Sequence, residues 1–318
     1  MTAKLIVRGS MLLYVVFGLI SCQTTANPPS EPPIENMKIA RLSAGDTTAL
    51  QQIRTEFVRN NPGYDLGYVE NTVELPQVPG NRVVFIQEGG GTAVINGQDS
   101  SKFSVGDIIL LGEAQGITTD SLFSALIFTV PEAPPENIPA FVRPDWDLNI
   151  TDVPGGCATE TNAYRRILLT WLGKVGPYNY HAINAHRVRI MDSFSHYHPK
   201  EGGFDEFYLV QMALPEAKIL TSSKVGKIED PASVGEEEVD GLIQSTKLEV
   251  GDLVYLPRGV MHRGVGGVLA QVITVPGFIP GSEIGVDHHL RRINHILSLK
   301  GAKGLPYNEA ASNEAVIK

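Results

Sequence analysis

The feature that most constrains this chain is a pair of histidines, His196 and His198, separated by a single residue, with a third histidine, His262, in a later segment. Successive side chains of a β-strand point to opposite faces, so His196 and His198 point the same way and one cation can bind both imidazoles. His262 follows a predicted turn and would supply a third imidazole. With one carboxylate, this set leaves coordination positions open on an octahedral metal.

Two glutamates compete for the place of the carboxylate. Glu206 starts the apolar run Phe-Tyr-Leu-Val, which predicts a strand, whereas Glu201 lies in the loop Pro-Lys-Glu-Gly-Gly. We favour Glu206 as the ligand and retain Glu201 as the alternative. Tyr208 shares the strand face of Glu206, so it is the first candidate for a proton donor or a hydrogen bond to substrate, and Glu201 is the second. A packed core phenol is the other interpretation of Tyr208.

The two segments resemble the paired motifs of the cupin superfamily. The second motif matches in full, with Gly251, Pro257, Gly259 and His262 at the family's spacing. In the first motif Glu206 lies further from His198 than is usual in that family. The resemblance implies a β-barrel that holds one divalent transition metal through the ligands His196, His198, Glu206 and His262. Ligand type alone does not choose between iron, manganese, nickel, cobalt and zinc.

An internal repeat extends the resemblance to the first half of the chain. Residues 103–111 align without gaps on residues 248–256, but the proline, glycine and histidine that follow the second copy are missing after the first. All eight histidines lie in the second half of the chain, so a first barrel is not expected to build a histidine site. The predicted fold is all-β, with two cupin barrels of the jelly-roll (double-stranded β-helix) type and a few flanking helices. We expect the first barrel to be a scaffold; binding of a ligand without metal is the alternative.

The expected order of parts follows from these motifs and from composition. It is a signal peptide (1–21), a tether (22–37), a degenerate first barrel (38–134), a connection (135–175), a metal-binding second barrel (176–284), and a C-terminal helix and tail (285–318). The acidic insertion 223–240 lies between the two motifs. Such a charge run is typical of a solvated surface loop, and a lid over the barrel mouth is the alternative.

Residues 1–22 are typical of a targeting segment. The uncharged run 11–20 is shorter than the about 20 apolar residues that a membrane-spanning helix needs. The ending Leu-Ile-Ser-Cys is similar to the lipobox of bacterial lipoproteins, which implies cleavage before Cys22 and lipid on that cysteine. Lipid would hold the protein at a membrane. By the sorting pattern of that family, Gln23 indicates the periplasmic face of the outer membrane; ordinary secretion is the alternative.

The net charge and the cysteine content limit which binding partners and cross-links are expected. The formal net charge is −9, and removing residues 1–21, whose only charges are Lys4 and Arg8, makes it −11. This balance, without a basic stripe, argues against nucleic acid. The cysteines are Cys22 and Cys157, so lipid on the first excludes an intrachain disulfide. We expect a small-molecule substrate or ligand and a membrane as partners, and the sequence leaves a homo-oligomer open.

The expected site narrows the chemistry without choosing one reaction. A metal with open positions would chelate a bidentate oxygen ligand such as an enediol, a carboxylate or a hydroxy-acid, and would act as a Lewis acid. We favour an enzyme that acts on a small oxygen-rich metabolite, with oxygenase-like or related redox chemistry first. The alternatives are an isomerase, a decarboxylase, a lyase, or a lipoprotein that binds a small molecule without turnover.

Overall fold

The computed structural model describes residues 36–153, 155 and 164–318. The predicted signal peptide, the lipidation cysteine Cys22 and the tether up to residue 35 lie outside the described residues, and so does Cys157. In the part of the chain that the structure describes, no helix has the length and the apolar character needed to cross a membrane.

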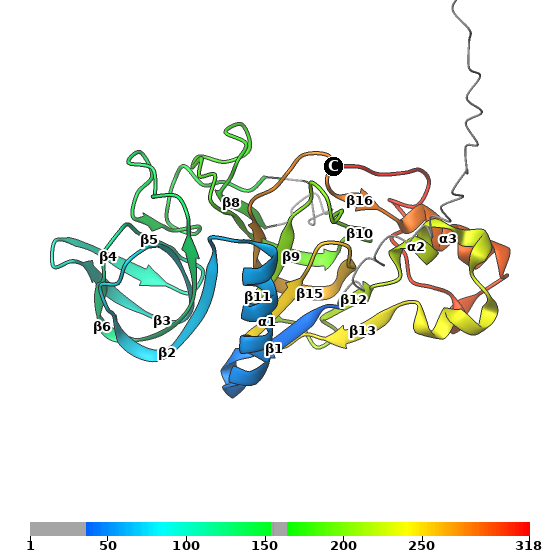
Figure 1. The fold of residues 1–318 in the computed structure, drawn as a ribbon, viewed down its shortest axis with the longest axis horizontal. Coiled ribbons are helices and arrows are strands. Elements are labelled where there is room, and N and C mark those ends of the chain that lie inside the picture. The colour runs from blue at the N-terminus through cyan, green and yellow to red at the C-terminus, as the bar shows by residue number, and fades with distance from the viewer. Residues whose placement is uncertain (1–35, 154, 156–163) are drawn as a thin grey trace, which may run out of the picture. The chain divides into compact units, whose positions relative to one another are not determined.

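The fold is all-β, as the sequence predicts, and its strands form two sheets with antiparallel pairing (Figure 1). Over the described residues the first sheet has six strands in the order β2-β6-β3-β5-β7, with β4 paired to β3. They are β2 (Asp65–Leu75), β3 (Asn81–Ile95), β4 (Asp99–Ser104), β5 (Ile108–Leu111), β6 (Ile117–Val130) and β7 (Phe141–Val142). Figure 1 shows these strands curling into a barrel.

The second sheet has ten strands among the described residues. They are β1 (Lys38–Arg41), β8 (Arg165–Leu169), β9 (Asn184–Asp192), β10 (His196–Tyr197), β11 (Asp205–Ala213), β12 (Lys218–Ser222), β13 (Gln244–Lys247), β14 (Asp252–Leu256), β15 (Met261–Val275) and β16 (Ile284–Gly285). The long strand β15 pairs with β9, β10, β11 and β12. It therefore connects β10, which carries His196, with the strand that begins at Asp205.

The first strand of the chain, β1, pairs with β14 and so belongs to the second sheet. Sequence analysis assigned this segment to the first barrel, whose own strands begin only at Asp65. Helix α1 (Thr47–Asn60) follows β1, and the side chain of its N-cap residue Asp46 accepts a hydrogen bond from Ala49 N at 3.0 Å. Local patterns predict this helix, but the pairing of β1 depends on a strand more than 200 residues away.

Apolar residues fill each barrel and the space between them. Alternate residues of β3 separate two cores: Val84 and Ile86 point into the first barrel, whereas Val83 and Phe85 pack between the sheets. In the core between the sheets, the rings of Phe57 (α1) and Phe207 (β11) have their centroids 5.2 Å apart. Burial of each such ring contributes about 1.5–3 kcal/mol, so α1 and both sheets are tied by packing. The first barrel is filled by apolar side chains.

The internal repeat recurs as a structural turn. Gly106 and Gly251 occupy equivalent positions with φ values of +97° and +87°, where a glycine avoids the strain of a left-handed backbone. The aspartate that follows each glycine folds back onto a backbone N–H: Asp107 accepts from Ser104 N at 2.9 Å, and Asp252 accepts from Glu249 N at 2.8 Å. The repeated Val-Gly-Asp sequence therefore encodes the same turn in both sheets, independent of any metal.

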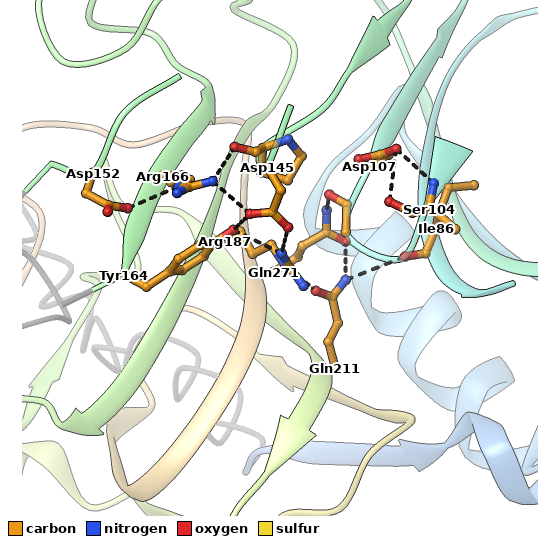
Figure 2. A network of polar contacts seen from close by, with 12 residues as sticks. Ile86, Ser104, Asp107, Asp145, Asp152, Tyr164, Arg166, Arg187, Gln211 and Gln271 are labelled. Carbon is orange, nitrogen blue, oxygen red and sulfur yellow. Dashed lines mark hydrogen bonds and ion pairs between the residues drawn. The ribbon is translucent and has the colours of Figure 1, made fainter. Parts of the chain in front are cut away.

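A buried polar network connects the two sheets (Figure 2). Gln211 of β11 donates to Ile86 O at 3.5 Å and to the side chain of Gln271 at 3.1 Å. Gln271 of β15 in turn donates to Gly106 O at 2.8 Å. These amides donate to buried backbone carbonyls of the first barrel, and they fix which residues of the two sheets face one another.

Arg187 of β9 extends this network. Its Nε donates to Gln211 Oε1 at 2.7 Å, and its Nη1 donates to Asp145 Oδ2 at 2.6 Å (Figure 2). A Cβ on Gly106 would lie 2.7 Å from Arg187 Nε. The glycine is therefore required twice, once for its backbone conformation and once for the close approach of the guanidinium.

The acidic insertion folds as a small helical cap. It contains α2 (Val225–Glu229) and the 3₁₀ turns η2 (Pro231–Ser233) and η3 (Glu236–Gly241). Val225 and Ile228 are buried with Leu290 and Ile293 of α3 (Asp287–Ile296), so this segment is not a bare surface loop. Among its acidic residues are apolar residues that pack against α3, a helix much later in the chain. Two further 3₁₀ turns are η1 (Leu42–Ala44) and η4 (Gly301–Lys303).

Candidate metal centre

Three buried imidazoles form the centre of the candidate site. His196 of β10 lies opposite His262 of β15 in the strand pairing, and His198 follows β10. One ring nitrogen from each lies within 4.8 Å of the other two, and all three side chains are at most 1% exposed. The structure thus brings together the three histidines that the sequence predicted, from segments more than sixty residues apart.

The backbone fixes which nitrogen faces the centre. His196 Nδ1 lies 3.1 Å from Phe194 O, and His262 Nδ1 lies 3.2 Å from Val260 O. A carbonyl only accepts hydrogen bonds, so Nδ1 carries the proton and Nε2 keeps its lone pair. Among the described residues the Nε2 atoms of His196, His198 and His262 have no hydrogen-bond partner. Three lone pairs directed at one point are a fit for a metal ion.

Burial keeps two of these imidazoles, His196 and His198, neutral. Desolvation lowers the pKa of His196 and His198 well below the usual value, and the neighbouring His262 lowers both further. A neutral imidazole is the form that binds a metal, so no proton has to be displaced from these two rings at neutral pH.

Glu206, at the second position of β11, brings a carboxylate to the histidines. Its Oε1 lies 3.1 Å from His262 Nε2, and its Oε2 lies 4.0 Å from His198 Nε2. The alternative carboxylate, Glu201, is exposed on the loop that precedes β11. Tyr208 is fully buried, and its ring centroid lies 6.3 Å from that of His262. The strand therefore presents Glu206 and Tyr208 on one face, as alternation predicts.

A second buried carboxylate, Glu283, was missed by sequence reasoning. Its Oε1 lies 3.9 Å from His196 Nε2, and the residue is 5% exposed. Burial, and then the neighbouring Glu206, raise the pKa of Glu283 to about 7. No motif marks Glu283; it reaches the site because β16, which follows it directly, pairs with β10.

A buried aspartate holds the turn that leads to His262. Asp205 Oδ1 accepts from Arg258 N at 3.0 Å, and its Oδ2 accepts from Asn61 Nδ2 at 2.6 Å and from Tyr255 Oη at 2.9 Å. The guanidinium of Arg258 donates to Asn61 Oδ1 at 2.7 Å. Arg258 therefore braces the turn against the end of α1 and does not face the metal centre.

A cavity of about 210 Å³ adjoins the site. Its polar wall includes Arg165, Asn184, His186, Glu206, Glu283 and Lys318. Two larger hollows, of about 600 and 450 Å³, lie on other parts of the described surface, and Glu206 lines neither of them. The small cavity is lined by Glu206 but by none of the three histidines, so it would bring a ligand to the candidate carboxylate.

Comparison with known proteins gives a likeness in structure only. No protein-family model matches the chain, and no curated protein sequence matches it. Salicylate 1,2-dioxygenase from Pseudaminobacter salicylatoxidans matches with a TM-score of 0.46 and 13% identity, over 86% of this chain and 90% of that one. An oxalate decarboxylase matches with a TM-score of 0.46 and 11% identity, over 76% of this chain and 78% of that one. A cupin 2 conserved barrel domain protein from Leptotrichia buccalis matches with a TM-score of 0.39 and 13% identity, over 67% and 84%. Likeness at this level transfers no activity, because one fold hosts many functions.

Proposed function

We propose that this chain is a metal-dependent enzyme of the cupin type that acts on a small oxygen-rich metabolite. The observation that carries the proposal is the group of three buried imidazole Nε2 atoms that have no hydrogen-bond partner among the described residues. A buried polar atom without a partner costs about 1–3 kcal/mol, and a bound cation would replace that cost with coordination. Three neutral nitrogens and one carboxylate suit iron, manganese, nickel, cobalt or zinc.

Oxygenase-like or related redox chemistry is our first proposal for the reaction, ahead of isomerase, decarboxylase or lyase chemistry. When bound, the metal would supply a Lewis acid with open positions for an oxygen ligand. Aromatic side chains cover two of the imidazoles: Phe194 stacks on His196 with ring centroids 4.3 Å apart, and Phe204 lies 3.9 Å from His198. This apolar cover supports redox chemistry because it excludes water from reactive species. Tyr208 and Glu206 lie on one face of β11, and we retain Tyr208 as the candidate proton donor.

The test is metal content, measured by mass spectrometry on the purified whole chain. Wild type is expected to hold close to one metal per chain. His196→Ala, His262→Ala and Glu206→Gln are expected to lose it, whereas Glu201→Gln, a change on the exposed loop, is the matched control that keeps it. Folded wild type that takes up none of the five candidate metals under anaerobic conditions contradicts the proposal.

The reaction class needs a second measurement. Oxygen consumption by the metal-loaded protein, with a panel of hydroxy-acids and enediols, separates oxygenase chemistry from the alternatives. Substrate loss without oxygen uptake would support an isomerase, decarboxylase or lyase. Tight binding of a metabolite without any turnover would leave a ligand-capturing protein.

We also propose, on the N-terminal sequence, that the protein is exported and anchored by lipid on Cys22 at the periplasmic face of the outer membrane. The support is the Leu-Ile-Ser-Cys ending and the following Gln23. Fractionation of cells that express wild type and Cys22→Ser tests this. Wild type is expected in the outer-membrane fraction and the variant outside it; equal distribution would support ordinary secretion.

A further inference from the structure

The cavity beside the metal centre carries two cationic side chains on its wall. Arg165 lies at the start of β8, where its guanidinium donates to Val153 O at 3.4 Å. Lys318 arrives from the far end of the chain: its backbone N–H donates to Glu283 O, and Glu283 N donates back to Lys318 O, each at 3.0 Å. This exchange places the tail beside β16 (Figure 1), next to the candidate site.

The ammonium group of Lys318 has a defined position. It lies 4.4 Å above the ring of Phe194, the same ring that stacks on His196. A cation over an aromatic face at this distance is attracted by the negative potential of the ring. Lys318, Arg165 and Glu283 all line the same cavity.

Two polar atoms on the cavity wall are buried without partners. Thr274 Oγ1 of β15 and His186 Nε2 of β9 have no hydrogen-bond partner among the described residues, and their side chains line the cavity. His186 is neutral, because burial and then the charge of Arg165 lower its pKa well below the usual value. A hydroxyl and a neutral imidazole left open at a cavity wall are groups that a polar ligand would satisfy.

Charge decides which polar ligand fits. Among the described side chains of this wall, Arg165 and Lys318 carry two positive charges, whereas Glu206 and Glu283 carry at most two negative charges, because the pKa of Glu283 is raised to about 7. A divalent metal on the neutral imidazoles would add two positive charges that nothing on this wall offsets. An uncharged ligand would leave this excess in a largely buried space, whereas an anion would neutralise it.

We propose that Arg165 and Lys318 form an anion subsite, and that the ligand of the metal centre is a small carboxylate. This inference rests on the proposed function, because the metal supplies part of the charge. The cavity volume of about 210 Å³ lies below the roughly 300–1,000 Å³ of pockets that hold drug-sized ligands. The ligand is therefore a small mono- or dicarboxylate, smaller than the drug-sized molecules that occupy larger pockets.

The test is titration calorimetry of the metal-loaded whole chain with malonate and with malonamide, its uncharged counterpart of nearly the same shape. Malonate is expected to bind and malonamide is not. Arg165→Gln and Lys318→Gln are each expected to weaken malonate binding about tenfold or more, with metal content and melting temperature unchanged. Arg292→Gln, on the exposed side of α3, removes the same charge outside the cavity and should leave binding unchanged. If Arg165→Gln does not fold, Arg165→Met, which keeps much of the side-chain length and removes the charge, replaces it.

The outcomes separate this inference from the proposed function. Metal-loaded protein that binds malonate and malonamide equally, or binds neither, overturns the anion subsite and leaves the metal centre standing. Equal malonate affinity in wild type, Arg165→Gln and Lys318→Gln also overturns it. A chain that takes up no metal contradicts the proposed function; malonate binding that still depends on both cations would then keep the subsite, and its absence would overturn both.

Discussion

Replacing Asp205 by asparagine tests how the fold positions His262. The carboxylate accepts hydrogen bonds from three donors, two on Oδ2 and the backbone N–H of Arg258 on Oδ1. An asparagine side chain has one acceptor oxygen, so at least one donor meets an NH₂ group and loses its partner. A buried donor left unsatisfied costs about 1–3 kcal/mol. Asp205→Asn is therefore expected to lower the melting temperature by roughly 2–10 °C.

The same change should weaken metal binding. The turn from Pro257 to Val260 leads into His262, and groups that orient a metal ligand typically contribute about ten- to hundredfold to affinity. Metal affinity, measured by competition with a chelator, is expected to fall within that range in Asp205→Asn. The control is Asp152→Asn, which removes a carboxylate that is 53% exposed and paired with Arg166, and should cost less than about 1 kcal/mol. Unchanged stability and unchanged metal affinity in Asp205→Asn would refute the argument that this carboxylate holds the turn.

Three other predictions follow from the geometry. Glu206→Gln is expected to lose the metal, and Glu283→Gln is expected to retain it. The reason is that Glu206 approaches two histidine nitrogens, at 3.1 and 4.0 Å, whereas Glu283 approaches one, at 3.9 Å. Metal content measured by mass spectrometry tests this, and the reverse result would make Glu283 the ligand. Burial raises the pKa of Asp107 to about 6, so the stability from its protonated form is present below about pH 4 and is lost as the pH rises through 6. Urea unfolding between pH 4 and 7 should show roughly 2–3 kcal/mol of this loss in wild type and not in Asp107→Asn; equal slopes would contradict it. Gly97→Ala, at φ +72° with nothing within 4 Å of the new Cβ, should lower the free energy of unfolding by about 1–2 kcal/mol. Gly106→Ala should lower it more, because its Cβ meets a guanidinium nitrogen at 2.7 Å. Equal losses would show that the Arg187 side chain moves away without cost.

Much of the candidate site was predictable because it depends on local rules. The close spacing of His196 and His198 brings both to one site although β10 ends at Tyr197, and strand alternation brings Glu206 and Tyr208 to one face of β11. The turn between Pro257 and His262 is also local, because Gly259 takes a φ of +87° that other residues avoid. These relations need no knowledge of the rest of the chain, and the structure shows each of them.

Other features depended on contacts between distant segments. The strand β1 was expected in the first barrel but pairs in the second, because an edge strand joins whichever partner the finished fold leaves open. The acidic insertion was expected as a solvated loop, but its few apolar residues find α3 and fold into a cap. A few apolar residues within a charged segment do not predict a packed structure, because their partner on α3 is distant in the sequence.

The sequence by itself determined the class of fold, the three histidines and the repeated Val-Gly-Asp turn, because strand alternation and backbone conformation act over a few residues. Only the tertiary structure decided the remaining wall of the site, where Glu283, Arg165 and Lys318 gather around a cavity without any shared motif. The physical reason is that the burial of a side chain, and the charges around it, depend on which other segments the fold brings next to it. Strand pairing creates that place, and the residues that line it come from segments whose spacing in the sequence carries no signal.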